Sequence, residues 1–377
     1  MTRTVTRHVP GKLFAAGEYA VVEPGNPAIL VAVDRRISVT VTAADSADGA
    51  DADVLVTSDL LPHEVRLRWR GDRLTGLGPE DDRTAQEALA HVVSALEVTD
   101  RLRAERGLPA SALHLTIGSR LHDRGRKYGL GSSGAVTVAT VEATAAYRGM
   151  ELPPAARFRL ALLATALIDP GPSGGDLAAS TWGGWISYRA PDRGAVLESA
   201  RRRGVEETLR VPWPEHEVRR LPSPRGLALV VGWTGRPAST TALVAGLDAR
   251  DWRGGPSHRD FLARSADCVR AATRAIEDGD RAALLDGFRT ARQLLARLDE
   301  ETGLGIFTPQ LRALCDTAEA VGGAAKPSGA GGGDCGIALL PEETPEQIAR
   351  LRARWEEAGI VPLPIRPADR RDQSNDR

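Results

Sequence analysis

Alternating apolar and polar positions mark the first third of the chain. Residues 37–43 (ISVTVTA) and 64–70 (EVRLRWR) repeat with a period of two, which is typical of half-buried antiparallel strands. The acidic segment between them, residues 45–54, has no such pattern and predicts a solvated loop without a function of its own. The chain is therefore expected to begin with an antiparallel sheet.

Helical patterns follow. Thr84 and Glu87 have the spacing of a capping box, which predicts a helix that begins there and ends at Gly107. Residues 134–147 are small or β-branched with few charges and predict a helix that is buried on most sides. Further helices are expected at residues 154–168, 257–279, 280–300, 309–323 and 344–359, and further strands at residues 111–119, 226–235 and 360–366.

A segment rich in arginine and proline, residues 189–226, breaks these patterns and predicts a domain boundary. We therefore expect an N-terminal domain at 1–190, a C-terminal domain at 191–366 and a disordered tail at 367–377. Strands and helices are mixed without strict βαβ alternation, so the fold class is predicted to be α+β.

Composition narrows the possible partners. The chain has 377 residues, of which 42% are hydrophobic and 26% charged, and its formal net charge is -1. Such a balance provides no overall basic field for nucleic acid or an acidic membrane, so small-molecule substrates are expected. The apolar helical run at 160–168 is too short to span a bilayer, and the three separated cysteines suggest neither a disulfide framework nor a zinc site. We expect a cytoplasmic monomer or homodimer.

Lysine is rare and unevenly placed. Lysine and arginine together number 49, yet only Lys12, Lys127 and Lys326 are lysines, and each lies in a glycine-rich segment. An ammonium group is a compact point charge that approaches a phosphate oxygen closely, whereas a guanidinium is bulkier and prefers two parallel contacts. The pattern predicts three phosphate-directed cations. Chance survival of lysine in an arginine-biased composition is the alternative.

The segment Lys127–Gly134 (KYGLGSSG) leads directly into the predicted helix at 134–147. Glycines allow the backbone to approach a ligand, and the N-terminus of a helix attracts anions. The segment is not a Walker A loop, and no GxGxxG follows a strand in a βαβ setting. It predicts a phosphate-binding loop, with a flexible spacer as the alternative.

Two further segments have similar chemistry. Residues 326–336 (KPSGAGGGDCG) predict close approach of the backbone to a ligand or another chain segment. Asp176 follows the turn at 172–175, where a helix is expected to begin, and could equally be an ordinary N-cap aspartate.

These segments resemble the motifs of the GHMP small-molecule kinase family. Residues 10–22 resemble its first motif, residues 127–136 its phosphate-binding motif, and residues 326–339 its C-terminal glycine motif. The resemblance implies an N-terminal domain like ribosomal protein S5 domain 2, a ferredoxin-like C-terminal domain, and a cleft between them for ATP and an acceptor. It also implies ATP and Mg²⁺ as cofactors.

The resemblance further implies roles for particular residues. Lys12 would contact the transferring phosphoryl group or the acceptor, Asp176 would orient Lys12 or the acceptor, and Lys127 would contact a phosphate. The nucleotide would be bound by Tyr128, Gly129, Leu130, Gly131, Ser132, Ser133 and Gly134, with Ser133 also contacting Mg²⁺. The acceptor would be bound by Ser173, Gly174, Gly175, Arg236, Ser239, Thr241, Lys326, Ser328, Gly329, Ala330 and Gly331.

Some assignments stay open at this point. Lys326 could equally brace its loop from behind. The segment that holds Arg236 could be a solvated loop, and Asp176 could act as a base. Asp334 has no assigned role. Lys12, the Lys127-Tyr128 pair and Gly134, which replaces the alanine usual in the family, favour members whose acceptor is already a phosphate. Members with an alcohol acceptor are the alternative, and a catalytically idle nucleotide sensor is the alternative outside enzymes.

Overall fold

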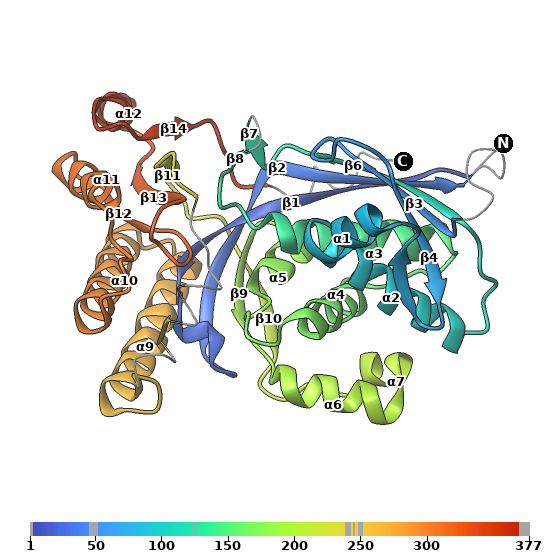
Figure 1. Ribbon diagram of the computed structural model, residues 1–377. Coiled ribbons are helices and arrows are strands. Elements are labelled where there is room, and N and C mark those ends of the chain that lie inside the picture. Colours follow the sequence, from blue (N-terminus) through green and yellow to red (C-terminus); the bar gives the residue numbers. More distant parts are fainter. Residues whose placement is uncertain are drawn as a thin grey trace.

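The computed structural model describes residues 3–44, 52–123, 126–237, 243, 246–247 and 252–368. Within these residues lie an eight-stranded sheet, a four-stranded sheet and a short hairpin (Figure 1). The first sheet contains β1 (Val5–Ala16), β2 (Pro27–Ala43), β3 (Val54–Ser58), β4 (Val65–Arg70), β5 (Arg73–Gly76), β6 (Leu113–Ser119), β9 (Trp185–Arg189) and β10 (Glu217–Leu221). The second contains β11 (Leu227–Trp233), β12 (Ala324–Pro327), β13 (Cys335–Pro341) and β14 (Val361–Leu363).

The first sheet has the order β10-β9-β2-β6-β3-β4-β5, and β1 pairs with β2. All of its pairs are antiparallel except β3 with β6. Helices α1 (Pro79–Glu87), α2 (Ala90–Glu105), α3 (Ser132–Tyr147), α4 (Pro154–Ile168) and α5 (Gly175–Trp182) lie together below this sheet in Figure 1. The small side chains of α3 allow it to pack on β1 and β2 while α2 and α4 pack on α3.

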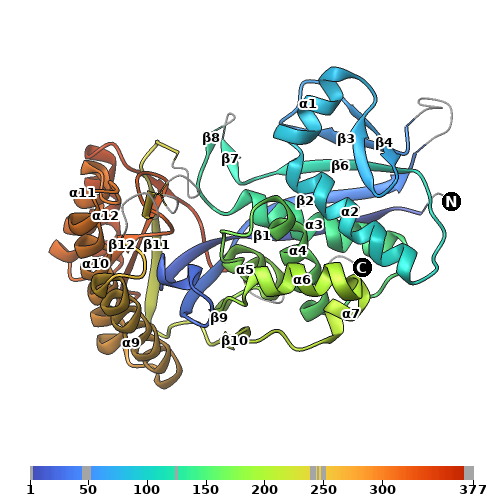
Figure 2. The ribbon, with the colours of Figure 1, turned by 60° about the horizontal axis from the view of Figure 1, so that its bottom comes forward.

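The second sheet has the order β12-β13-β11-β14. Its helices are α9 (Pro256–Asp278), α10 (Arg281–Thr302), α11 (Pro309–Ala320) and α12 (Pro345–Glu357), and α9 also contacts β1, β2 and the short 3-10 helix η1 (Ala20–Val22). The hairpin of β7 (His122–Asp123) and β8 (Arg126–Lys127) projects from the first sheet on the side of the second, as Figures 1 and 2 both show. The α+β class is confirmed.

The predicted start of the first helix was wrong. Thr84 lies inside α1, which begins at Pro79 after Gly78, and a separate helix α2 begins at Ala90. Proline at the first helical position and acidic residues in the first turn favour the earlier start. At α11 the N-cap is Thr308, whose side chain accepts a hydrogen bond from the Leu311 N–H.

The domain boundary predicted after residue 190 does not coincide with the point where the chain passes from the first sheet to the second. The segment expected to be irregular contains α6 (Arg193–Arg203), α7 (Val205–Arg210) and β10, and β10 completes the first sheet. The chain thus changes sheet between Leu221 and Leu227, and we propose the domain boundary there. Pro367, expected in the tail, forms a bridge with Val33 in β2, whereas residues 369–377 and the acidic residues 45–51 lie outside the described residues.

Candidate active site

Lys12 lies in β1 between two irregularities of the strand, which fall at Pro10/Lys12 and Phe14/Ala16. Such bulges turn a side chain out of the regular alternation of a strand. The Lys12 N–H donates to Leu130 O at 2.8 Å, and its Nζ donates to Gly129 O at 3.4 Å. The side chain is only 8% exposed, so the ammonium is held directly beneath the glycine loop.

The glycine loop leads into α3 through two residues with positive φ, Gly129 at 77° and Gly131 at 76°. Gly131 is the N-cap of α3, and no side chain caps that helix. A Cβ atom at Gly131 would lie 2.9 Å from Lys12 Cε, and one at Gly129 would lie 2.4 Å from Asp334 Cγ. Glycine is therefore required by both φ and space, and the first N–H groups of α3 remain available to an anion.

Asp176 approaches the same loop from α5. Gly174, with φ at 77°, precedes this helix, and Asp176 lies half-buried in its first turn. Its Cβ is 3.4 Å from the position of a Cβ at Gly131, and its Oδ2 is 2.3 Å from that of a Cβ at Gly134. No ion pair within 4.0 Å joins Lys12 to Asp176, both of which the structure describes. The two charges thus border one space without neutralising each other directly.

The third glycine-rich segment closes this space from the second sheet. Ser328 Oγ accepts from the Phe14 N–H at 2.8 Å and donates to Phe14 O at 3.1 Å. The Tyr19 hydroxyl donates to Ala330 O at 2.5 Å, and a Cβ at Gly329 would lie 4.0 Å from Lys12 Nζ. The three glycine-rich segments that hold the lysines, around Lys12, at residues 127–134 and at residues 326–336, therefore meet around the Lys12 side chain.

Lys326 does not face this space. It is fully buried, and its Nζ donates to the Glu18 carboxylate, to Pro327 O at 2.7 Å and to Phe14 O at 3.5 Å. The pairing with Glu18 neutralises its charge and favours the alternative in which Lys326 braces its loop from behind, so its contact with an acceptor stays a prediction. Ser328 is likewise buried, and its hydroxyl bonds the main chain of β1, so it holds the loop where a substrate contact was expected.

Comparisons with known proteins agree with this geometry. Residues 90–184 match the family model for the GHMP kinases N terminal domain, and residues 273–359 match that for the GHMP kinases C terminal. The chain is 64% identical over 366 residues to the phosphomevalonate kinase of Streptomyces sp. strain CL190, covering 97% of this chain and 98% of the relative. The chain belongs to the GHMP kinase family.

Other relatives are more distant. The mevalonate kinase of Thermococcus sibiricus is 27% identical over 364 residues, 95% of each chain. The Streptococcus pneumoniae phosphomevalonate kinase, solved in complex with phosphomevalonate and AMPPNP, has a TM-score of 0.83 and 26% identity, covering 96% of this chain and 99% of that one.

The remaining predicted residues of this GHMP kinase differ in their exposure. Lys127 and Arg236 have exposed side chains, and Arg236 O accepts from the Asp334 N–H at 2.7 Å. Ser239 and Thr241 lie outside the described residues. Three further side chains shape the loops. Tyr128 is buried edge-on against Trp233 with ring centroids 5.2 Å apart, Leu130 is buried, and Ser173 Oγ accepts from the Gly175 N–H.

Sequence reasoning missed several residues that support the site. Glu18 neutralises Lys326, and the signal was a carboxylate within the apolar run LFAAGEYAVV. Tyr19 was missed as well; burial raises its pKa, so its hydroxyl stays protonated and able to donate. Asp299 accepts from the N–H groups of Gly305, Ile306 and Phe307 at 2.7 to 2.9 Å, yet nothing in its amphipathic helix distinguished it.

His91 is half-buried at the start of α2, and its Nδ1 lies 3.5 Å from Thr137 Oγ1 in α3. Burial lowers its pKa, while the nearby Asp176 charge opposes that shift. His91 is therefore neutral at neutral pH and adds no fourth cation to the site.

This burial predicts a pH-dependent stability. Because the folded state lowers the pKa of His91, the unfolded state takes up its proton first, and stability is lost as pH falls below about 6.5. We expect His91→Gln to make the free energy of unfolding fall less steeply than in the wild type between about pH 7 and pH 5. Urea unfolding at several pH values measures this, and identical slopes for both proteins would contradict it.

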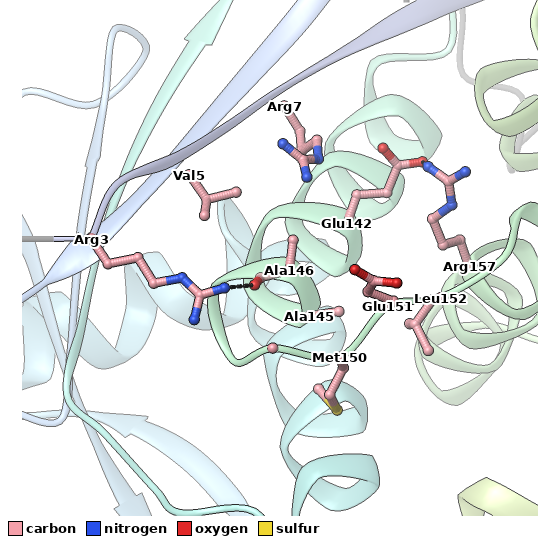
Figure 3. Close-up of a pocket in the computed structure, with 11 residues that line it drawn as sticks. Arg3, Val5, Arg7, Glu142, Ala145, Ala146, Met150, Glu151, Leu152 and Arg157 are labelled. Atoms are coloured by element: carbon pink, nitrogen blue, oxygen red, sulfur yellow. Dashed lines mark hydrogen bonds and ion pairs between the residues drawn. The ribbon is translucent and has the colours of Figure 1, made fainter. Parts of the chain in front are cut away.

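A cavity of about 450 Å³ lies elsewhere, between the start of β1 and the end of α3 (Figure 3). Its charged groups largely bond one another and the backbone: Glu142 pairs with Arg157 at 2.8 Å, and Arg3 donates to Ala146 O. Since Lys12 and the glycine loop occupy the opposite ends of β1 and α3, this cavity is not the kinase site.

The helices in the described part of the chain include none with the length and apolar character needed to span a bilayer.

Proposed function

We infer that this chain is a phosphomevalonate kinase. It transfers the γ-phosphoryl group of ATP to the phosphate of 5-phosphomevalonate and releases ADP and 5-diphosphomevalonate. The observation that carries this proposal is the 64% identity to a phosphomevalonate kinase over nearly the whole chain, against 27% to a mevalonate kinase. The geometry around Lys12 supports it.

The acceptor chemistry explains why the site is built from cations and backbone N–H groups. A phosphate monoester has a second pKa of about 6, so at neutral pH the nucleophilic oxygen is mostly unprotonated. A general base therefore has little proton to remove, and catalysis depends on bringing two anions together and neutralising their charge. The ammonium of Lys12 and the open N-terminus of α3 meet this need.

Each part of the site then has a proposed role. Lys12 contacts the transferring phosphoryl group, and Gly129 to Gly134 bind the phosphates of ATP. Lys127, exposed on the hairpin just before the loop, neutralises a further phosphate charge. Arg236, exposed in the loop after β11, binds the acceptor together with Ser239 and Thr241.

Magnesium fits this site as a partner of the nucleotide. The described residues contain no group of three or more His, Cys, Asp or Glu side chains that could hold a metal ion. Mg²⁺ usually keeps several waters and takes one or two protein oxygens together with the phosphates of its substrate. Ser133, in the first turn of α3, offers such an oxygen. When bound, the metal would neutralise part of the phosphate charge.

An acceptor panel tests the proposed function. ADP release is measured with ATP and, in turn, 5-phosphomevalonate, mevalonate and homoserine. We expect kcat/KM for 5-phosphomevalonate to exceed the other values by at least about 10²-fold, because a site built to pair with a polar group strongly rejects analogues that lack it. Faster turnover of mevalonate or homoserine would identify a kinase with an alcohol acceptor, and no turnover of any acceptor would favour a nucleotide sensor.

Asp176 offers a test of whether a base is needed. Asp176→Asn keeps the shape of the side chain but removes its charge and its ability to take a proton. With a phosphate acceptor we expect kcat to fall by less than about 10²-fold, below the range typical of losing a general base. A fall equal to that of Lys12→Met would mean that Asp176 anchors the lysine, and a fall well beyond that range would contradict the base-free account.

A further inference from the structure

Gly134 has no backbone reason to be glycine. It lies in the first turn of α3, it is buried, and it is not among the residues with positive φ. Within a helix, glycine is less favourable than alanine by about 0.8 to 1.0 kcal/mol. A residue that weakens a central helix without any conformational need calls for another explanation.

The space around Gly134 supplies that explanation. A Cβ atom there would lie 2.3 Å from Asp176 Oδ2 and 2.6 Å from Asp176 Cγ, far inside normal contact distance. The carboxylate of Asp176 thus occupies the place that an alanine methyl group would take. At this place the positive end of the helix dipole stabilises the negative charge.

The backbone that carries Asp176 cannot easily give way, because the start of α5 is fixed on several sides. Ser180 Oγ donates to Pro10 O at 2.7 Å, only two residues before Lys12 in β1. A Cβ at Gly175 would lie 3.2 Å from both Leu30 and Phe14, so the backbone of α5 already packs closely on β1 and β2. An added methyl group at position 134 would therefore displace the carboxylate and leave the helix in place.

We propose that Gly134 is a positioning residue: the absence of a side chain there places the Asp176 carboxylate over the first turn of α3, beside Lys12. The proposal deepens the proposed phosphoryl transfer and rests on it for its activity readout. Gly134 touches no reacting atom and acts only through Asp176.

Gly134→Ala tests the proposal by separating activity from stability. We expect kcat to fall by about tenfold or more, since misplacement of a catalytic group by about 1 Å can cost up to about 10²-fold. KM for ATP should stay within about threefold of wild type, because an interaction used only in the transition state affects kcat. Stability should be unchanged or higher, since the gain in helix propensity offsets the displaced contact.

Gly287→Ala is the matched control. Gly287 also lies inside a helix, α10. Among the described residues its Cβ would meet only Ala272, with Cβ at 3.3 Å and Cα at 3.7 Å, away from the site. This variant should gain helix propensity without any change in kcat. A wild-type kcat in Gly134→Ala would overturn the proposal. If KM for ATP rose while kcat stayed unchanged, the proposal would also fail, because Gly134 would then make room for the nucleotide.

A double-mutant cycle with Asp176→Ala completes the test, because this variant empties the contested space. In that background, Gly134→Ala should cause no further loss of kcat and should raise the urea midpoint by more than it does in the wild type. Equal stability changes in both backgrounds, or additive losses of kcat, would contradict the proposal. The stability arm needs no substrate, so it distinguishes failure of this proposal from failure of the proposed function.

Discussion

Lys12→Met lowers kcat with 5-phosphomevalonate by at least about 10²-fold, the scale of losing one charge-stabilising donor in a transition state. Methionine keeps the length and apolar stem of lysine but has no charge. Among the described residues, Lys12 Nζ makes one long hydrogen bond, 3.4 Å to Gly129 O, and lies 5.3 Å from the centroid of the Phe14 ring. Because both contacts are weak, the free energy of unfolding should stay close to that of the wild type. Steady-state kinetics and urea unfolding measure the two quantities.

Lys12→Arg is the informative companion, because it restores the positive charge in a larger group. The space above the lysine stem is narrow: Lys12 Cε lies 2.9 Å from the position of a Cβ at Gly131. A forked guanidinium therefore cannot lie where the ammonium lies. We expect kcat to stay well below wild type. Near-normal turnover of Lys12→Met would remove Lys12 from the mechanism, and full activity of Lys12→Arg would refute a specific need for an ammonium group.

Lys326→Met is expected to have the largest effect on stability. It removes the positive partner of the Glu18 carboxylate, which is also buried and cannot reach water. Breaking a buried ion pair in this way typically costs about 3 to 5 kcal/mol. Urea unfolding should show a lower midpoint with an unchanged m-value, which marks a change in stability alone.

The control for this prediction is the double variant Glu18→Leu with Lys326→Met. Replacing a whole buried ion pair by apolar side chains of similar volume is often neutral, since no charge is left without a partner. The double variant should therefore recover much of the lost stability. A single variant as stable as the wild type would show that the pair does not hold the third glycine-rich segment against β1.

The glycine loop and Lys12 were predictable because their chemistry is local. Positive-φ glycines before a helix, with a lysine in each converging segment, indicate a phosphate site without knowledge of tertiary contacts. Family resemblance added that the three segments meet. The hydrogen bonds of Lys12 with Gly129 and Leu130, and those of Ser328 and Tyr19 between the first and third segments, confirm that they do.

Burial was the property that the sequence could not supply. Lys326 has the same sequence environment as Lys12 and Lys127, yet only the tertiary structure places Glu18 beside it. The contact of Gly134 with Asp176 likewise joins two helices that are distant in sequence. β10 was missed because its residues, EVRRL, are mostly exposed and carry little apolar pattern.

The central claim is that the acceptor is a phosphate group, and phosphorus NMR of the reaction with ATP and 5-phosphomevalonate tests it most directly. We predict that the single resonance of the monoester gives way to a pair of mutually coupled resonances from a new P–O–P linkage, in step with the formation of ADP. An unchanged monoester resonance, together with rapid conversion of mevalonate to an uncoupled monoester phosphate, would contradict the account.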